Sequence, residues 1–181
     1  MTMRLKLYTL LCASFLFLFT SCNQDDDPVP PEAGSKTVLV YIVADNSLAS
    51  FAKEDVEEMI EGMKLVGSSS CNLLVYQDDR NTPVLFRIAK DKKGNVEKEV
   101  IKEYAEQVST DVSVMKEVMH RAFYEYPADS YGLVYWSHAD GWIPYPVPSA
   151  STRWIGQDKG AGQDNRMNIS DLVTVLDDNM P

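Results

Sequence analysis

The amino-acid sequence predicts an α/β domain with a mainly parallel sheet and helices on its faces. Continuous apolar, β-branched runs at 37–44, 73–76 and 131–137 are typical of strands covered on both faces. Apolar residues at helical spacing lie between these runs, at about 48–66 and 110–126. The order strand, helix, strand, helix, strand favours parallel strands joined by crossover helices.

The first strand, 37–44, is followed by Asp45, Asn46 and Ser47, whose side chains are suited to capping a helix start. The helical pattern then continues to about Val66, where a glycine and three serines follow and end it.

Less regular elements follow the second strand. Residues 83–88 are apolar enough for a strand, and the polar stretch 91–94 indicates a turn. The segment 96–108 is ambiguous, part strand and part helix. Thr110 is suited to cap the next helix, and Pro127 ends it.

After the strand at 131–137, the sequence predicts a short strand at 154–158 and a flexible polar loop at 159–166. An apolar pattern at 167–176 then predicts a final helix.

Binding and catalytic sites in such sheets gather beyond the carboxyl ends of the strands. Asp45, Asp78, Asp79 and His138 leave strands in this way. The three acidic residues have two interpretations. They are either cap and turn residues, or a site for a cation or a basic peptide.

The N-terminus has the features of a secretory signal over 1–21. Arg4 and Lys6 precede about 13 mostly apolar residues at 7–19, a run too short to span a membrane. A threonine and a serine directly precede Cys22, which resembles a bacterial lipobox. The alternative is an ordinary signal peptide with an incidental cysteine.

Residues 22–36 are acidic and proline-bearing, and they predict a flexible tether between the lipidated Cys22 and the domain at 37–181. The expected location is the bacterial cell envelope, with the lipid in the outer membrane. Acidic residues after a lipidated cysteine also resemble a surface-export signal, although plain solvation of a linker explains them too.

Charge and cysteine content restrict the function further. Removal of the signal lowers Lys plus Arg from 17 to 15 against 27 Asp plus Glu, a net charge of about −12 that argues against nucleic-acid binding. Cys12 leaves with the signal and Cys22 would carry lipid, so Cys71 is the one thiol of the mature part. Its apolar surroundings predict a buried packing residue.

The two histidines differ in their surroundings. His120 lies among polar residues on the solvated face of a predicted helix. His138 directly follows a buried strand, where an imidazole is held rigidly and is accessible to substrate. A general acid or base is one interpretation of His138, and a polar loop residue is the other.

The segment 126–142, YPADSYGLVYWSHADGW, resembles the histidine segment of clostripain-type cysteine peptidases. Residues 40–48 and 72–78 resemble the first two strands of that family. The similarity covers roughly 37–181, the N-terminal part of the peptidase domain.

This resemblance implies a caspase-like three-layer α/β/α sandwich in which a cysteine–histidine pair cleaves peptides after Arg or Lys. His138 matches the catalytic histidine, and Ala139 and Gly141 match positions whose backbone N–H groups form the oxyanion hole. The resemblance requires no cofactor, although calcium is a candidate by family. Peptides or proteins are the implied substrates.

Two departures from the family pattern are clear. Ala139 stands where the family usually has glycine. The nucleophile of the family follows the next strand, after the helix matched by 167–176, and these 181 residues contain neither. The sheet is therefore expected to be incomplete at its C-terminal side, and the chain alone is predicted to be inactive.

Family members are often processed between histidine and cysteine after a basic residue. The candidate processing sites here are Arg153, Lys159 and Arg166, although each can also be an ordinary basic residue of a loop. A non-catalytic or truncated lipoprotein acting as a binding module is the alternative function. Serine and metal hydrolases are disfavoured, because no Gly-x-Ser-x-Gly, His-Glu-x-x-His or Cys-x-x-Cys spacing occurs and no metal site is predicted.

Overall fold

The computed structural model of the chain describes residues 35–66, 71–91, 93–140 and 154–181. The predicted signal peptide, the lipidation site Cys22 and nearly all of the tether lie outside these ranges. Within the described ranges, no helix combines the length and the apolar content that crossing a bilayer requires.

Five strands form the central sheet in the order β4-β3-β2-β1-β5. They are β1 (Lys36–Val43), β2 (Cys71–Asp78), β3 (Val84–Lys90), β4 (Val96–Glu103) and β5 (Ser130–Trp136). β1 pairs in parallel with β2 and β5, whereas β3 pairs antiparallel with β2 and β4. β3 alone therefore runs against the other four strands, which confirms the mainly parallel sheet.

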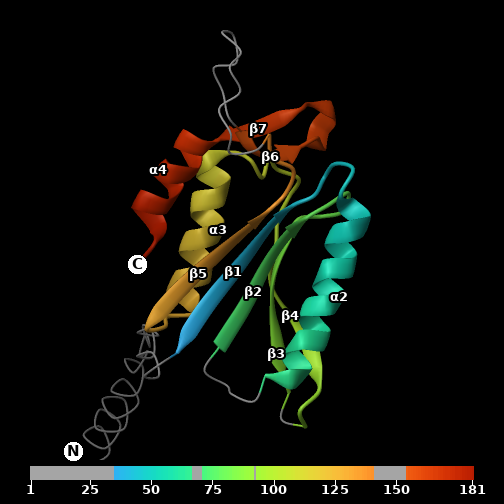
Figure 1. The fold of residues 1–181 in the computed structure, drawn as a ribbon, viewed down its shortest axis with the longest axis vertical. Helices are drawn as coiled ribbons and strands as arrows, with labels where there is room; N and C mark the ends of the chain where they lie inside the picture. The colour runs from blue at the N-terminus through green and yellow to red at the C-terminus, as the bar shows by residue number, and fades with distance from the viewer. Residues whose placement is uncertain (1–34, 67–70, 92, 141–153) are drawn as a thin grey trace, which may run out of the picture.

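Helices cover both faces of this sheet (Figure 1). Helix α2 (Ala49–Leu65) packs on one face, and α3 (Val112–Glu125) and α4 (Ile169–Asn179) lie on the other. Successive side chains of a strand point in opposite directions, so each buried strand contributes apolar side chains to both faces of the sheet. The predicted three-layer α/β/α arrangement is confirmed.

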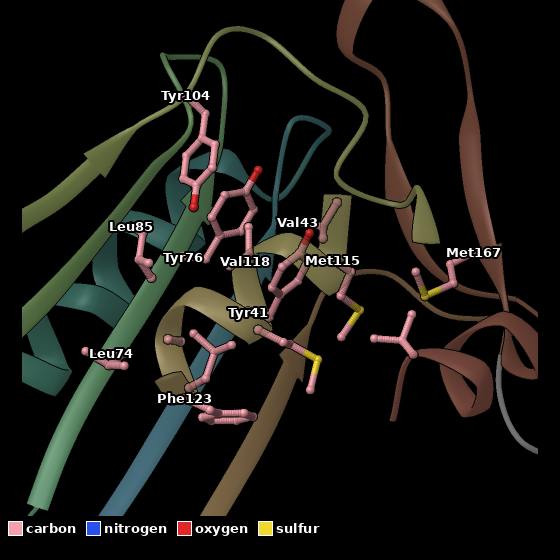
Figure 2. Packing of buried hydrophobic residues seen from close by; sticks show 14 residues of the cluster. Tyr41, Val43, Leu74, Tyr76, Leu85, Tyr104, Met115, Val118, Phe123 and Met167 are labelled. Atoms are coloured by element: carbon pink, nitrogen blue, oxygen red, sulfur yellow. The ribbon is translucent and has the colours of Figure 1, made fainter. Parts of the chain in front are cut away.

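The face under α3 has an aromatic core at the carboxyl ends of the strands. Tyr41 of β1 stacks on Tyr76 of β2, with ring centroids 4.6 Å apart, and on Tyr135 of β5 at 5.7 Å. Figure 2 shows Tyr41, Tyr76 and Met115 of α3 in this cluster, with Met167 contributed from the C-terminal part of the chain. This stacking stabilises the pairing of β2, β1 and β5 close to the edge where His138 lies.

A second, two-stranded sheet crosses this edge (Figure 1). It consists of β6 (Trp154–Asp158) and β7 (Asn165–Asn168), joined through the short 3-10 helix η1 (Gly160–Gly162). The short strand predicted at 154–158 is confirmed. The flexible loop predicted at 159–166 is wrong, because β7 and η1 order most of it against β6.

Three other boundaries differ from the sequence prediction. The ambiguous segment 96–108 is a strand to Glu103 and then continues without a helix. The side chain of Asp111, not that of Thr110, caps α3 by accepting a hydrogen bond from the Ser113 N–H at 2.7 Å. The last helix begins two residues later than predicted, at Ile169, because Met167 belongs to β7.

The surroundings of Gly156 show that β6 packs closely against the main sheet. Its φ is +88°, and an added Cβ would lie 2.0 Å from the hydroxyl oxygen of Tyr135, whose ring is itself stacked on Tyr41. Gly156→Ala should therefore lower the free energy of unfolding by about 2 kcal/mol or more, through strain and overpacking.

The control is Gly62→Ala in α2, where nothing lies within 4 Å of an added Cβ. That change should stabilise the protein by up to about 1 kcal/mol, since alanine is the better helix former. Denaturant unfolding of both variants measures the two effects. Equal stability of Gly156→Ala and the wild type would contradict the packing described here.

Candidate functional site

His138 follows β5 at the carboxyl end of the sheet, and its backbone is fixed against β6. Its carbonyl oxygen accepts a hydrogen bond from the Gly156 N–H at 2.8 Å, and the Asp140 N–H donates to the Trp154 carbonyl at 3.2 Å. A β-bridge joins Ala139 to Ile155. The half-buried His138 therefore extends from a short, paired segment with a defined backbone.

The same pairing orients the backbone of Ala139. The hydrogen bonds around the bridge are made by its neighbours, so Ala139 and Ile155 form a non-hydrogen-bonded antiparallel pair. In such a pair the N–H group points away from the partner strand. The Ala139 N–H is thus directed away from β6, on the exposed side of the segment. Gly141, the other predicted oxyanion residue, lies outside the described residues.

Two side chains, here called the Asn46–Ser137 clamp, tie the ends of β1 and β5 to β6. The Ser137 hydroxyl donates to the Val43 carbonyl at 2.7 Å and accepts from the Gln157 N–H at 3.1 Å. The Asn46 amide donates to the same Val43 carbonyl at 3.2 Å and to the Gln157 carbonyl at 2.5 Å. Asn46 is only 3% exposed, so its bonds form away from solvent, whereas the bonds of Ser137 are partly buried.

The clamp brings a serine to the histidine. Ser47 Oγ lies 2.9 Å from Nε2 of His138. The sequence predicted Asp45, Asn46 and Ser47 as cap residues, and the structure corrects this. The N-cap residue of α2 is Leu48, which has no side-chain cap, and Asn46 Oδ1 accepts from the Leu48 N–H instead.

A signal for Ser47 was present in the sequence. Ser47 and His138 each follow a strand in the predicted parallel sheet, so both belong at the same edge. To predict the contact, the order of the strands is also needed, because Ser47 meets His138 only if β1 lies beside β5. Sequence spacing does not give that order.

Four carboxylates gather beside this site and form what we call the acidic cluster. Its members are Asp45, Asp78, Glu106 and Asp158. Asp78 and Asp158 are fully buried, and Ser109 links them. The Ser109 hydroxyl donates to Asp78 Oδ2, and its N–H donates to Asp158 Oδ2 at 2.6 Å.

Gly160 lies where three members of the cluster meet. A Cβ on Gly160 would lie 2.6 Å from Glu106 Oε1, 3.0 Å from Asp158 Oδ1 and 3.2 Å from Asp45 Oδ2. The Gly160 N–H donates to Asp158 Oδ1 at 2.7 Å. Only a glycine leaves room for carboxylates from such distant parts of the chain to converge.

Burial raises the pKa of three carboxyls of this cluster, those of Asp45, Asp78 and Glu106. The pKa of Asp78 rises to about 8, mainly by desolvation, against the lowering effect of the Ser109 hydrogen bond. Desolvation also raises the pKa of Asp45 and of Glu106, and repulsion from Asp158 adds to both. Asp78 Oδ1 is buried with no hydrogen-bond partner among the described residues. The Asp78 carboxyl therefore holds its proton at pH values where exposed carboxyls are ionised.

Asp79 does not join the cluster through hydrogen bonds. Its carboxylate accepts from the Asn81 backbone N–H at 2.9 Å and from the Gln77 side-chain amide at 2.9 Å, so it orders its own turn. Among the described residues, no group of three or more His, Cys, Asp or Glu side chains is arranged to hold a metal ion.

The remaining predicted residues are dispersed. Lys159 is exposed, and its backbone N–H donates to the Asp45 carbonyl at 2.8 Å. Arg166 is exposed in β7, pairs with Asp164 at 2.7 Å and lies over the Trp154 ring. Arg153 lies outside the described residues. His120 is exposed as predicted.

Cys71 is half-buried rather than fully buried, and it has no disulfide partner. It pairs with Lys36 at the first row of β1, whereas Trp136, two residues before His138, pairs with Ile42. Six rows at about 3.3 Å each separate these positions by roughly 20 Å. Cys71 therefore lies at the opposite end of the sheet from His138.

Comparison with known proteins identifies similar chains. A sequence profile of the clostripain family matches residues 40–181. A solved cysteine protease of B. fragilis is 55% identical, with a TM-score of 0.59, over 64% of this chain and 98% of that chain. No curated protein matches the sequence.

Two further structures are similar. A secreted C11 cysteine protease of Bacteroides thetaiotaomicron, solved with an irreversible peptide inhibitor, is 56% identical with a TM-score of 0.72. It covers 82% of this chain and 40% of that one. An inactive zymogen C11 protease of Parabacteroides distasonis is 36% identical with a TM-score of 0.58, over 64% of this chain and 34% of that one. The chain thus spans about two fifths or less of these two proteins.

The raised pKa of Asp78 predicts a pH dependence of stability. An acid with a higher pKa in the folded state binds more protons folded than unfolded, so stability falls as pH rises from about 4 to about 8. The slope from this one group is at most about 1.4 kcal/mol per pH unit. Asp78→Asn, which does not titrate, should reduce that slope in denaturant unfolding measured across this range.

Asp79→Asn is the matched control, because the Asp79 carboxylate bonds within its own turn. It should retain the slope of the wild type. An unchanged slope in Asp78→Asn would show that the buried carboxyl does not take up a proton on folding.

Proposed function

This chain belongs to the clostripain family of cysteine peptidases, and from that membership we propose that it supplies the histidine half of an endopeptidase site specific for Arg or Lys. The observation that carries the proposal is the placement of His138 at the carboxyl edge of the sheet, on a segment paired with β6. A general acid–base needs this combination of access and rigid support.

In this mechanism a cysteine thiolate attacks the peptide carbonyl carbon and forms a C–S bond. His138 accepts the thiol proton and gives it to the amine nitrogen as the C–N bond breaks. Water then hydrolyses the acyl-enzyme and regenerates the thiol. The Ala139 N–H, which points away from β6, is the candidate donor to the oxyanion.

The nucleophile in this proposal is not Cys71, the one cysteine among the described residues, because Cys71 lies at the far end of the sheet from His138. β5 offers a place for it. β5 is the last strand of the sheet among the described residues, and Val134 on it is 47% exposed. A strand carrying the cysteine and paired with β5 would present it next to His138.

The acidic cluster supports the preference for a cationic side chain. Asp45 lies two residues from Ser47, which contacts His138, and its carboxylate converges with those of Glu106 and Asp158. A Lys or Arg side chain entering here would neutralise charge that now raises the pKa of Asp45 and Glu106. The cluster thereby favours a basic residue at the cleavage position.

We extend the proposal to processing and location. Lys159 and Arg166 are exposed on the segment after His138, where a family peptidase is cut, and Arg153 belongs to the same stretch. The signal-like residues 1–21 and Cys22 favour a lipoprotein of the cell envelope. The B. thetaiotaomicron relative is described as secreted, which is consistent with export.

Substitution of His138 tests the peptidase function. In the complete protein, His138→Ala should abolish hydrolysis of Arg and Lys peptides, a loss of at least about 100-fold in kcat. His120→Ala is the control, because His120 is exposed on α3 and stacks on Tyr124. Fluorogenic peptide cleavage measures both variants.

Unchanged cleavage in His138→Ala would remove His138 from the mechanism. Absence of cleavage in the complete wild-type protein would instead favour the alternative, a non-catalytic binding module that retains the scaffold.

A second prediction concerns specificity. Asp45→Asn should lower kcat/KM for Arg and Lys peptides by about tenfold relative to a matched Gln peptide, since it removes one charge from the cluster. Asp91→Asn, in the turn between β3 and β4 at the opposite end of the sheet, removes the same charge and should leave that ratio unchanged. Equal ratios in all three proteins would exclude Asp45 from substrate selection.

A further inference from the structure

The contact between Ser47 and His138 joins two segments that are 91 residues apart in sequence. Ser47 follows β1 and His138 follows β5, and these two strands are neighbours in the sheet. Ser47 Oγ lies 2.9 Å from Nε2, a normal hydrogen-bond distance. Ser47 itself is exposed. Its hydrogen bond can hold His138 in place only if the backbone around both residues is fixed.

That support comes from the Asn46–Ser137 clamp. Each clamp residue directly precedes one member of the pair, since Asn46 precedes Ser47 and Ser137 precedes His138. Both clamp side chains bond to the Val43 carbonyl and to the backbone of Gln157. Both loops are therefore fixed to the same two residues, Val43 and Gln157, and the separation of Ser47 and His138 follows from these buried and partly buried hydrogen bonds.

Further bonds restrict the Ser47 loop. The Asn46 N–H donates to the Ala44 carbonyl, and the Ala44 N–H donates to the Asp78 carbonyl, both at 2.6 Å. The Arg80 guanidinium donates to the Asn46 carbonyl at 3.3 Å. With Asn46 Oδ1 bonded to the Leu48 N–H, the backbone on both sides of Ser47 is held.

We propose that Ser47 is the positioning residue of the catalytic histidine, accepting a hydrogen bond from Nε2–H so that Nδ1 exchanges protons with the nucleophile and the leaving amine. This inference rests on the proposed function. A neutral imidazole has one N–H, and the partner of one nitrogen sets the role of the other. Nδ1 has no hydrogen-bond partner among the described residues.

The same contact would also fit Ser47 as a nucleophile with His138 as its base. A base in that role is itself oriented through its second nitrogen by a third group. Among the described residues, no such group bonds to Nδ1 of His138. The geometry therefore favours orientation of the histidine by the serine over activation of the serine by the histidine.

The kinetic test uses the complete protein and a peptide with Arg at the cleavage position. Ser47→Ala should lower kcat by about tenfold with KM nearly unchanged, because a less firmly oriented imidazole is less often in the reacting geometry. Ser47→Thr keeps the hydroxyl and should restore most of the rate. Ser50→Ala, which removes an exposed serine three residues along, is the matched control.

An imidazole measurement separates this inference from the peptidase function. In 15N-histidine-labelled protein, with His120→Gln used to assign the signals, neutral His138 should carry its proton on Nε2. That proton should exchange slowly with solvent in the wild type and Ser47→Thr, and faster in Ser47→Ala.

The outcomes decide the inference as follows. A proton on Nδ1, or unchanged exchange and kcat in Ser47→Ala, would overturn the positioning role. Loss of all cleavage in Ser47→Ala, with no rescue by Ser47→Thr, would overturn it in favour of a serine nucleophile. If the wild type cleaves no peptide, the proposed function fails, and the imidazole signals still report whether Ser47 orients His138.

Discussion

The edge of the sheet that carries the candidate site depends on the hydrogen bonds of Asn46, which are buried, and of Ser137, which are partly buried. These two side chains satisfy the carbonyl of Val43 at the end of β1 and both backbone groups of Gln157 in β6. Buried backbone groups at strand ends are costly when unpaired, so the clamp is favourable in itself. It also determines how the loops after β1 and β5 leave the sheet, and thus where Ser47 and His138 lie.

The clamp stabilises the fold, whereas the acidic cluster next to it has an unfavourable effect on stability. Asp78 and Asp158 are buried within reach of Asp45 and Glu106, and desolvation raises the pKa of three of the four. Burial of like charges destabilises a fold unless protons or cations are taken up. Such an arrangement beside the candidate site is available for binding a cationic group, and the proposed substrate preference uses this property. In that proposal, stability and specificity are linked at the same residues.

The elements that the sequence predicted well are those with a strong, contiguous apolar pattern. The run at 37–44 became β1, which is buried over most of its length, and the run at 131–137 became β5. Cover on both faces of β5 was predicted wrongly, since its residues are half-buried or exposed. His138 was located correctly after a strand, because the apolar run before it is a local signal. Prediction failed where tertiary pairing overrides local composition. The polar stretch 159–166 looks like a flexible loop, yet β7 and η1 order it because β6 offers a strand to pair with.

The sequence by itself determined the α/β class, the family and the position of His138 at a strand end, because hydrophobic periodicity and a contiguous motif are local properties. Only the tertiary structure decided which other residues meet that histidine. Asn46 and Ser47 follow β1, His138 follows β5 and Gln157 lies in β6, so these residues come from three separate segments. Their meeting requires β1 to lie beside β5 and β6 to cross both. Strand order and loop direction arise from packing of the whole chain, so no local pattern encodes them.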